Sequence, residues 1–593
     1  MKTNDYDIKI ELVGGIPVVA SCMKKMKFAE TIDELLGEIR SNGNRFSHGK
    51  TCFVFLLYLL CRGDVISKVS EWVSQTAYLR VLFPDIKNEY FNEDRLEDTL
   101  DAIHKSGIQN LFASQVIKII EAFKLEVNQV HLDLTAFSVY GDHYDENGYV
   151  IINYGHSKDG RDDLKQFCQE AGVSNDGGVP VTQTTLSGNT NDSTRYVPMW
   201  WSLKNILQKN DFLIVGDCKL TSQENMLTIC RNRGYYLGPL TSYSSVNENL
   251  DILLDDEPEL MLLHEVKKAK GKVVVYSGVE RTNWLADPET NQPYLQRWIY
   301  IHSTELEHTA LASFDARLEE LQKRLTAINE KVNTKWYGTS EKIEEAVISA
   351  LSHQKFPADI LTFNINESLY RIPVKKKGRP SSNNQPDEYI EKKLLKLEYT
   401  LNEEKILKLK RRCGYFVLVT NKEYDKLSMK EALLAYKEEW KVEGVFSRLK
   451  GTLQVIPMRL KLTNRIESMM YLQMTCVQIY ALIDREAKNR LASGGEKLVG
   501  LFPKKRAVAS PKTEFMLEAL DHFGLAFTRD EDEFSVRVSG VSPFVKKLFI
   551  LMNVIPAYYD NKFVSSQLSI AETLDSEELY QAMRFIEDYT GIS

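Results

Sequence analysis

Apolar positions recur every three to four residues through most of the start of the chain. They keep this spacing in 51–60, 65–82 and 108–123, and such a period is typical of helices with one buried face. The pattern predicts a mostly helical region over residues 1–125. No side chain in this region carries visible chemistry.

The period changes at Val127, where strand-like segments begin. The expected elements are strands at 130–141, 148–154 and 178–186, a helix at 195–209, a buried strand at 211–217 and a helix capped by Ser222. Three antiparallel-looking strands, a helix, a buried strand and a further helix follow the order of a ribonuclease-H-like α/β core. We predict this fold by analogy.

The pattern changes again from about residue 241 to residue 410. Strand-like pieces alternate there with charged helical stretches, and the polar segment 375–388 is expected to be an exposed loop. The strand-like pieces are 272–277, 297–303 and 360–372, and the clearest helical stretch is 311–332. A buried strand at 415–420 and a long helix from about 428 to 450 follow.

Composition narrows the class of protein. The chain has 593 residues, of which 43% are hydrophobic and 26% charged, as in globular proteins of several domains. Its longest apolar run, 52–61, is shorter than the ~20 residues that cross a bilayer, and the charged start does not resemble a signal peptide. Eight cysteines without a CxxC pair indicate reduced thiols, not a zinc cluster or disulfides. We expect a cytoplasmic protein.

The net charge of −7 does not indicate a nucleic-acid-binding protein, but the average charge says little about local patches. A basic run between 441 and 465 contains one acid, Glu443, and six cations: Lys441, Arg448, Lys450, Arg459, Lys461 and Arg465. Such a run is either a solvated face or a surface that contacts phosphates.

Two aspartates lie where a sheet could hold a metal. Phosphodiester transfer commonly uses two divalent cations roughly 3.5–4 Å apart, and Mg²⁺ prefers carboxylate oxygens. Asp133 lies between apolar neighbours in an expected strand, on the same face as His131 and Thr135, and Asp217 follows the apolar run 212–215. An aspartate at a strand end is also a common turn or cap residue, so position alone leaves both roles open.

A third carboxylate lies in the expected long helix. Tyr436, Glu443 and Lys450 are spaced by seven residues, nearly two helical turns, so they share one face with a drift of ~20°. That face would present a metal-binding carboxylate between a phenol and an ammonium. It is equally compatible with a solvated face.

Several ordered motifs resemble one family. Residues 436–450 resemble the Tyr-(2)-Arg-(3)-Glu-(6)-Lys signature of the insertion-sequence-four group of DDE transposases, and residues 131–141 resemble the first carboxylate stretch of that group. Residues 155–166 are similar to the Gly-(Tyr/His)-Ser-(Lys/Arg)-Asp stretch of its large-insert, insertion-sequence-1634-like branch. Further similarity lies in 178–180, 188–192 and Asp217 with Leu220, Ser222 and Asn225. The resemblance runs from about 130 to 470.

The resemblance implies a catalytic site. It implies Asp133, Asp217 and Glu443 as the catalytic residues and ligands of two Mg²⁺ ions, with Mn²⁺ as a substitute. It implies Tyr436 and Lys450 as contacts to DNA phosphates.

The sequence departs from the family at one position. Glu439 occupies the arginine position of the signature. Arg448 and Lys441 are candidates to replace that arginine at the DNA.

The motifs and the resemblance together predict five regions. These are a helical, DNA-binding domain at 1–125, the first part of the catalytic core at 126–240, a mainly β-stranded insertion at 241–410, the second part of the core with the third acid at 411–490, and a small α/β region at 491–593.

The expected function is that of a bacterial DNA transposase at the nucleoid. It would cut the terminal inverted repeats of an insertion sequence and join them to target DNA, as a homodimer on double-stranded DNA and without a membrane. A hairpin end, with Trp284 or Trp298 stacked on a flipped base, is a further expectation, although either tryptophan could belong to the core. Two alternatives stay open: a catalytically silent DNA-binding protein, which Glu439 favours, and a ribonuclease-H-like nuclease without strand transfer.

Overall fold

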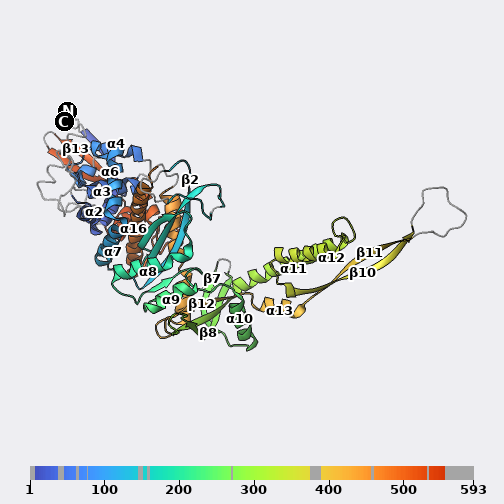
Figure 1. The fold of residues 1–593 in the computed structure, drawn as a ribbon. Coiled ribbons are helices and arrows are strands. Elements are labelled where there is room, and N and C mark those ends of the chain that lie inside the picture. The colour runs from blue at the N-terminus through green and yellow to red at the C-terminus, as the bar shows by residue number, and fades with distance from the viewer. Residues whose placement is uncertain are drawn as a thin grey trace, which may run out of the picture. The chain divides into compact units, whose positions relative to one another are not determined.

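A computed structural model describes residues 7–37, 46–61, 66–76, 78–143, 151–156, 160–268, 271–373, 389–455, 460–530 and 533–553 (Figure 1). The chain forms two compact units. The first, called here the core unit, comprises residues 1–238, 285–294 and 434–593, and the second, the insertion unit, comprises 239–284 and 295–433.

The core unit contains five neighbouring strands of a mixed sheet, in the order β4-β3-β2-β5-β6. Its strands are β2 (Gln129–Val139), β3 (Lys165–Ser174), β4 (Pro180–Ser187), β5 (Leu213–Val215) and β6 (Tyr235–Pro239). The first three pair antiparallel, and β5 pairs parallel to both β2 and β6. This order and these directions agree with the predicted ribonuclease-H-like arrangement.

The helices between the strands also agree with the predicted pattern. They are the 3₁₀ turn Asp192–Thr194, α8 (Tyr196–Leu207) and α9 (Gln223–Arg231). Ser222 caps α9 as predicted, because its hydroxyl accepts a hydrogen bond from the Asn225 backbone N–H.

The second strand of the sheet was predicted at the wrong place. It is β3, whereas the predicted segment 148–154 forms no strand in its described part, 151–154, where Asn153 makes only an isolated bridge to Gln166. Residues 148–150 lie outside the described residues. The strand β3 is buried along nearly its whole length although it carries Gln166, Gln169 and Glu170. A strand buried on both faces shows no alternation of apolar and polar residues, so the sequence pattern does not reveal it.

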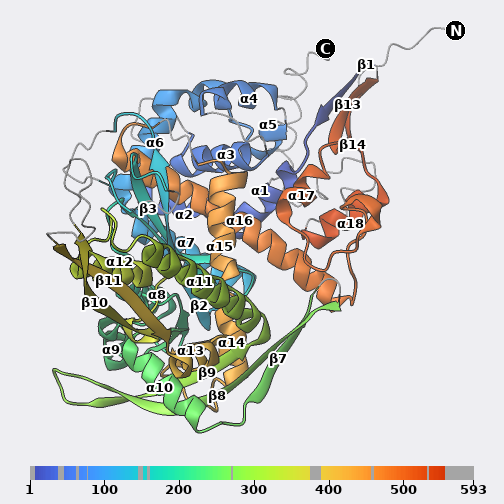
Figure 2. The same cartoon turned by 90° about the vertical axis from the view of Figure 1, so that its right-hand side faces the viewer.

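The N-terminal part of the core unit is mostly helical. They are α1 (Ile16–Lys25), α2 (Phe28–Leu36), α3 (His48–Cys61), α4 (Val69–Gln75), α5 (Tyr78–Leu82), α6 (Glu93–Ser106) and α7 (Ile108–Phe123), with 3₁₀ turns at Ile66–Lys68 and Asn88–Phe91. The helical prediction for 1–125 is confirmed for these residues. The 31-residue helix α16 (Thr463–Ser493) packs against α1, α3, α6, α7 and β4 (Figure 2).

The two ends of the described chain share a sheet. The strand β1 (Asp7–Leu12) pairs antiparallel with β13 (Gly524–Asp530), which pairs with β14 (Glu533–Ser539). The same C-terminal region contains α17 (Thr513–Glu518), α18 (Pro543–Leu551) and the 3₁₀ turn Pro503–Lys505. The first strand therefore belongs with the predicted region 491–593, which corrects the assignment of all of 1–125 to one helical domain.

The insertion unit is not mainly stranded. Its strands are β7 (Met261–Lys267), β8 (Val273–Ala286), β9 (Pro293–Ser303), β12 (Tyr415–Thr420) and the hairpin β10 (Leu361–Pro373) and β11 (Tyr389–Leu401), and its helices are α10 (Ser244–Asp255), α11 (Thr304–Glu330), α12 (Ser340–His353), α13 (Glu403–Arg411) and the 3₁₀ turn Ala358–Ile360. Side chains of α11 and α12 form one apolar cluster with Leu395 and Leu397 of the hairpin. The prediction of a mainly β insertion is therefore wrong, and the loop predicted at 375–388 lies outside the described residues.

No helix in the described ranges is both long and apolar enough to cross a membrane.

One buried hydrogen-bond network joins three elements of the core unit. Gln478 of α16 accepts from the Gln115 side chain of α7 at 2.9 Å and donates to the Pro180 carbonyl of β4 at 2.8 Å. Tyr471 donates to the other end of the Gln115 amide at 2.7 Å. Because all of these groups are buried, losing one partner leaves another without compensation.

We therefore expect Gln478→Leu to lower the free energy of unfolding by about 2–3 kcal/mol. Urea denaturation followed by circular dichroism measures this change. Gln473→Leu is the matched control, because Gln473 is also buried on α16 but its side-chain oxygen accepts no hydrogen bond within the described residues. Equal losses in the two variants would contradict the role given to the network.

Candidate active site

The two predicted aspartates lie at the same level of neighbouring parallel strands. The register pairs His131 of β2 with Val215 of β5. Asp133 lies two residues beyond the first of these and Asp217 two residues beyond the second. Since adjacent strands are about 4.8 Å apart, the pairing brings the two residues to the same level of the sheet, where β5 ends.

A buried tyrosine holds the second aspartate. The Tyr196 hydroxyl donates to Oδ1 of Asp217 at 2.7 Å, and the Lys219 backbone N–H donates to the same oxygen at 2.8 Å. Burial, followed by the charge of Asp217, raises the pKa of Tyr196 far above its usual value. Tyr196 therefore stays protonated and acts as a donor. In the sequence, Tyr196 is marked only by its place at the start of a predicted helix.

The predicted long helix at 428–450 is broken into three pieces, which corrects the single helix expected from the sequence. They are α14 (Met429–Lys437), α15 (Trp440–Ser447) and a π-helical turn, Arg448–Thr452. Around Glu438 and Glu439 the backbone bonds have the tighter three-residue spacing. Because three-residue and five-residue turns replace the regular α-helical repeat, seven-residue spacing alone does not establish a common face.

The helix α15 packs against β2 and β3 and carries the third acid, Glu443, with its side chain exposed. Glu439 immediately precedes this helix. Burial raises the pKa of Glu439 to about 7, and the negative charges of Asp133, Glu443 and Asp217 add to the increase. The three predicted acids thus all lie close enough to Glu439 to repel its charge.

Tyr436 belongs to the same group of side chains. Burial raises its pKa to about 12, with contributions from the charges of Glu439 and Asp217. The phenol therefore faces the carboxylates as a neutral hydrogen-bonding group near neutral pH.

Lys450 lies on the π-helical turn after α15. Its ammonium is 5.4 Å from the centre of the Phe137 ring of β2, and the residue is exposed. This position leaves the ammonium at the surface near the end of β2, where a phosphate could reach it.

Arg448 is held inside the protein, away from the role proposed for it at the DNA. Its guanidinium donates to Asp484 at 2.7 Å and to Glu514 at 2.7 Å, and its side chain is 11% exposed. This two-acid environment satisfies the charge within the fold, so the structure does not present Arg448 as a substitute for the missing arginine.

Lys441 is also engaged within the fold. Its ammonium donates to the Asn175 carbonyl at 2.7 Å, forms an ion pair with Glu438 at 2.8 Å, and its side chain is 10% exposed. Together with burial, its charge lowers the pKa of His131 to about 3, so that histidine is neutral. Lys441 is therefore not presented at the surface either.

The basic run at 441–465 is consequently not one continuous surface. In addition to Lys441 and Arg448, Arg465 forms ion pairs with Asp101 and Glu97. Arg459 lies outside the described residues, and Lys461 is exposed. Internal ion pairs thus account for half of the six cations.

The carboxylates have the chemistry of a site for a hard divalent cation. Within the described ranges, however, no three His, Cys, Asp or Glu side chains are arranged so that they could hold a metal ion. The oxygen donors and the uncompensated repulsion on Glu439 nevertheless fit such a cation, because a positive ion would relieve that repulsion. The acids that supply these oxygen donors are Asp133, Asp217 and Glu443, with Glu439 beside them.

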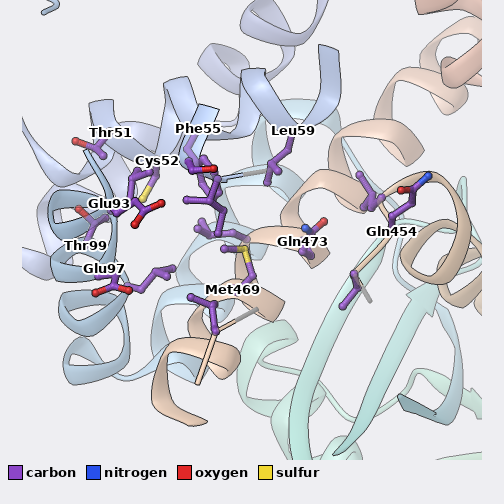
Figure 3. Close-up of a pocket in the computed structure, with 18 of the residues that line it drawn as sticks. Thr51, Cys52, Phe55, Leu59, Glu93, Glu97, Thr99, Gln454, Met469 and Gln473 are labelled. Carbon is purple, nitrogen blue, oxygen red and sulfur yellow. The ribbon is translucent and has the colours of Figure 1, made fainter. Parts of the chain in front are cut away.

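A separate cavity of about 600 Å³ lies between α3, α6, α16 and residues 452–455 (Figure 3). Phe55, Leu59 and Met469 line its apolar part, and Glu93 and Glu97 lie at one end (Figure 3). None of the four carboxylates described above lines it. The cavity therefore does not belong to the candidate active site.

The two tryptophans considered for base stacking differ in exposure. Trp298 packs against an apolar cluster of the insertion unit, whereas Trp284 is 60% exposed. Trp298 therefore belongs to the core of the insertion unit, which was the alternative to base stacking. Trp284 is the exposed one of the two.

The comparisons with known proteins identify the family. A family model described as a transposase DDE domain matches residues 132–479, more than half of the 593-residue chain. The chain therefore belongs to the DDE transposase domain family. The family model of a domain of unknown function (DUF4277) matches residues 8–117.

The structural comparison adds one similar chain, a piggyBac transposase in a synaptic complex with hairpin DNA. The sequence identity is 9%, the match covers 85% of this chain and 79% of that chain, and the TM-score is 0.34. A search among curated proteins gave no match.

The raised pKa of Glu439 predicts a pH dependence of stability. Between its ordinary value of 4.5 and about 7, the folded chain keeps a proton that the unfolded chain has lost, so stability falls as the pH rises. The Glu439→Gln variant has no carboxyl group to titrate at this position, so it does not lose this stability as the pH rises. In metal-free buffer, we expect it to gain on the order of 1–3 kcal/mol in unfolding free energy relative to the wild type between pH 5 and pH 8.

Urea denaturation at several pH values measures this difference. Glu438→Gln is the matched control, since it removes a neighbouring carboxylate that pairs with Lys441. Parallel pH profiles for the wild type and Glu439→Gln would show that Glu439 is not coupled to the other acids.

Proposed function

We propose that the chain is a DNA transposase that cleaves the ends of an insertion sequence and joins them to target DNA. The observation that carries this proposal is the convergence of Asp133, Asp217 and Glu443 on one residue, Glu439. The three acids come from β2, from the end of β5 and from α15, three elements far apart in sequence. Because the chain belongs to the DDE transposase domain family, we interpret these three acids as its catalytic acids.

Asp133, Asp217 and Glu443 would hold two Mg²⁺ ions, or Mn²⁺ in their place. Bound there, the cations supply activation of the attacking oxygen and stabilisation of the leaving oxygen. Asp133 belongs to β2, Asp217 follows β5, and Glu443 belongs to α15, which packs against β2. Carboxylates on such elements have little freedom to move. Water would first attack the phosphodiester at the end of the element and break its P–O3′ bond, which leaves a 3′-hydroxyl and a 5′-phosphate. That 3′-hydroxyl would then attack a phosphodiester of target DNA at the same site and displace the target strand's own 3′-hydroxyl.

Tyr436 and Lys450 are the proposed contacts to DNA phosphates. Tyr436 faces the carboxylates as a neutral phenol, and Lys450 stands at the surface after α15. Since Arg448 and Lys441 are engaged in internal ion pairs, neither supports the role of the missing arginine. We further propose the insertion-sequence-four group, large-insert branch, a homodimer on two paired ends, and action at the nucleoid of a bacterium.

Glu439 also favours a second candidate, a catalytically silent DNA-binding protein. A carboxylate at the arginine position repels phosphates instead of attracting them. The retention of all three acids around one site favours the enzyme, and a nuclease without strand transfer would share that site.

The first test uses purified full-length protein, Mg²⁺ and a labelled duplex that carries the terminal repeat of the host element. We expect nicks at the repeat boundary and, with added target DNA, joined products. Asp217→Asn and Glu443→Gln should each reduce cleavage at least a thousandfold, because each removes a charged group on which the metal site depends.

The outcomes separate the candidates. Nicks without joined products would support the nuclease. A wild type that binds the duplex but never cuts it with Mg²⁺ or Mn²⁺ would support the silent DNA-binding protein, and Glu439→Arg would then be expected to restore cleavage.

A second test separates the two cations near α15. Lys450→Gln should weaken DNA binding several-fold and reduce its salt dependence, with a smaller effect on the thermal midpoint than Arg448→Gln. Arg448→Gln should instead destabilise the fold by about 3 kcal/mol, because Asp484 and Glu514 lose their shared partner. Fluorescence anisotropy at several salt concentrations and thermal denaturation measure the two effects. A stability loss confined to Lys450→Gln would reverse this assignment.

A further inference from the structure

Among the described residues, the hydrogen bonds that the Asp217 carboxylate accepts share one oxygen. They come from the Tyr196 hydroxyl and from the Lys219 N–H, and both fall on Oδ1. Two donors on one oxygen fix the rotation of a carboxylate, because turning it would break both bonds. The orientation of the second oxygen is then determined as well.

Tyr196 is itself held firmly. It is 3% exposed and is the first residue of α8. The preceding residue, Arg195, forms two hydrogen bonds with the Glu170 carboxylate of β3, at 2.9 and 3.1 Å, and Glu170 is 1% exposed. This buried bidentate pair attaches the start of α8 to the sheet, and with it the backbone that carries the phenol.

The strand end beside the tyrosine leaves room for its ring. A Cβ atom at Gly216 would lie 2.7 Å from Cε1 of Tyr196, closer than real Cβ contacts allow. The residue next to the catalytic aspartate therefore has to be glycine for the ring to reach this position. The glycine, the tyrosine and the buried ion pair form one support for Asp217.

We propose that Tyr196 is a positioning residue that orients the Asp217 carboxylate for a divalent cation, and that Gly216 admits the ring that does so. This inference rests on the proposed function, in which Asp217 is a metal ligand. Partners of this kind, which contact a ligand and not the metal, typically change metal affinity by 10–100-fold when they are removed. The Glu170–Arg195 pair supports the tyrosine from behind.

The test is Mn²⁺ binding to the full-length protein without DNA, measured by the electron paramagnetic resonance signal of free Mn²⁺. Tyr196→Phe removes only the hydroxyl and should weaken Mn²⁺ binding by about tenfold. Gly216→Ala should weaken it by at least as much, because the added methyl group displaces the ring.

Tyr471→Phe is the matched control. Tyr471 lies on α16, and its buried hydroxyl donates to Gln115 of α7 at 2.7 Å. The variant therefore also removes a buried tyrosine hydroxyl, but one whose partner is not an acid of the site. We expect a similar loss of thermal stability in the two Tyr→Phe variants but wild-type Mn²⁺ affinity only in Tyr471→Phe. Equal affinities in Tyr196→Phe and Tyr471→Phe would overturn the positioning role.

Asp217→Asn separates the failure of this inference from that of the proposed function. If Asp217→Asn loses Mn²⁺ binding while Tyr196→Phe keeps it, the positioning role is wrong and the metal site stands. If Asp217→Asn binds Mn²⁺ as tightly as the wild type does, Asp217 is not a ligand, and both proposals fail.

Discussion

The candidate site depends on the parallel pairing of β2 with β5. This pairing aligns His131 with Val215. Asp133 and Asp217, which are 84 positions apart in the sequence, therefore come to one level of the sheet. A shift of the register by one residue would turn one of the two aspartates to the opposite face. The neighbouring antiparallel strands and the buried residues of β3 hold the register, since they fix β2 from its other side.

The same pairing creates an electrostatic cost. Acids that lie close together repel one another, and burial increases the repulsion because less water screens it. At Glu439, burial raises the pKa to about 7, and repulsion from Asp133, Glu443 and Asp217 adds to the increase. Local hydrogen-bond donors offset part of this cost. The Tyr196 hydroxyl and the Lys219 N–H donate to Asp217, and the Leu134 N–H donates to Asp133 at 2.7 Å. Stability provided by the surrounding core therefore maintains a local arrangement that is unfavourable by itself.

Much of the core could be predicted from the sequence because its signals are local. The apolar run before Asp217 and the Ser222 cap each depend on a few neighbouring residues, and the structure has both. The same holds for the strand at Tyr415–Thr420, which belongs to the insertion unit. β3 could not be predicted, because its polar residues are satisfied by distant partners: Glu170 by Arg195, and Gln169 by Gln183. A short window of sequence carries no sign of such partners.

The candidate site shows the same division. Asp133 and Asp217 could be singled out because strands of strong local pattern carry them. Spacing by seven residues pointed to Glu443, although the helix is broken at Glu438 and Glu439 and continues as a π turn. The roles of Arg448 and Lys441 could not be foreseen, because their acidic partners Asp484 and Glu514 lie far along the chain and Glu438 lies at the break. A basic run therefore indicates charge but not where that charge is used.

Glu439 puts a carboxyl group where the signature has a positively charged arginine. Neither Arg448 nor Lys441 compensates for it, since internal acids engage both. A group of four carboxylates repels a DNA phosphate until cations neutralise it. On the proposed mechanism, cation binding must then precede or accompany the approach of the cleaved strand, because no fixed guanidinium takes its place. On the same proposal, a site with Glu439 depends more strongly on bound cations than a site with the arginine of the signature would.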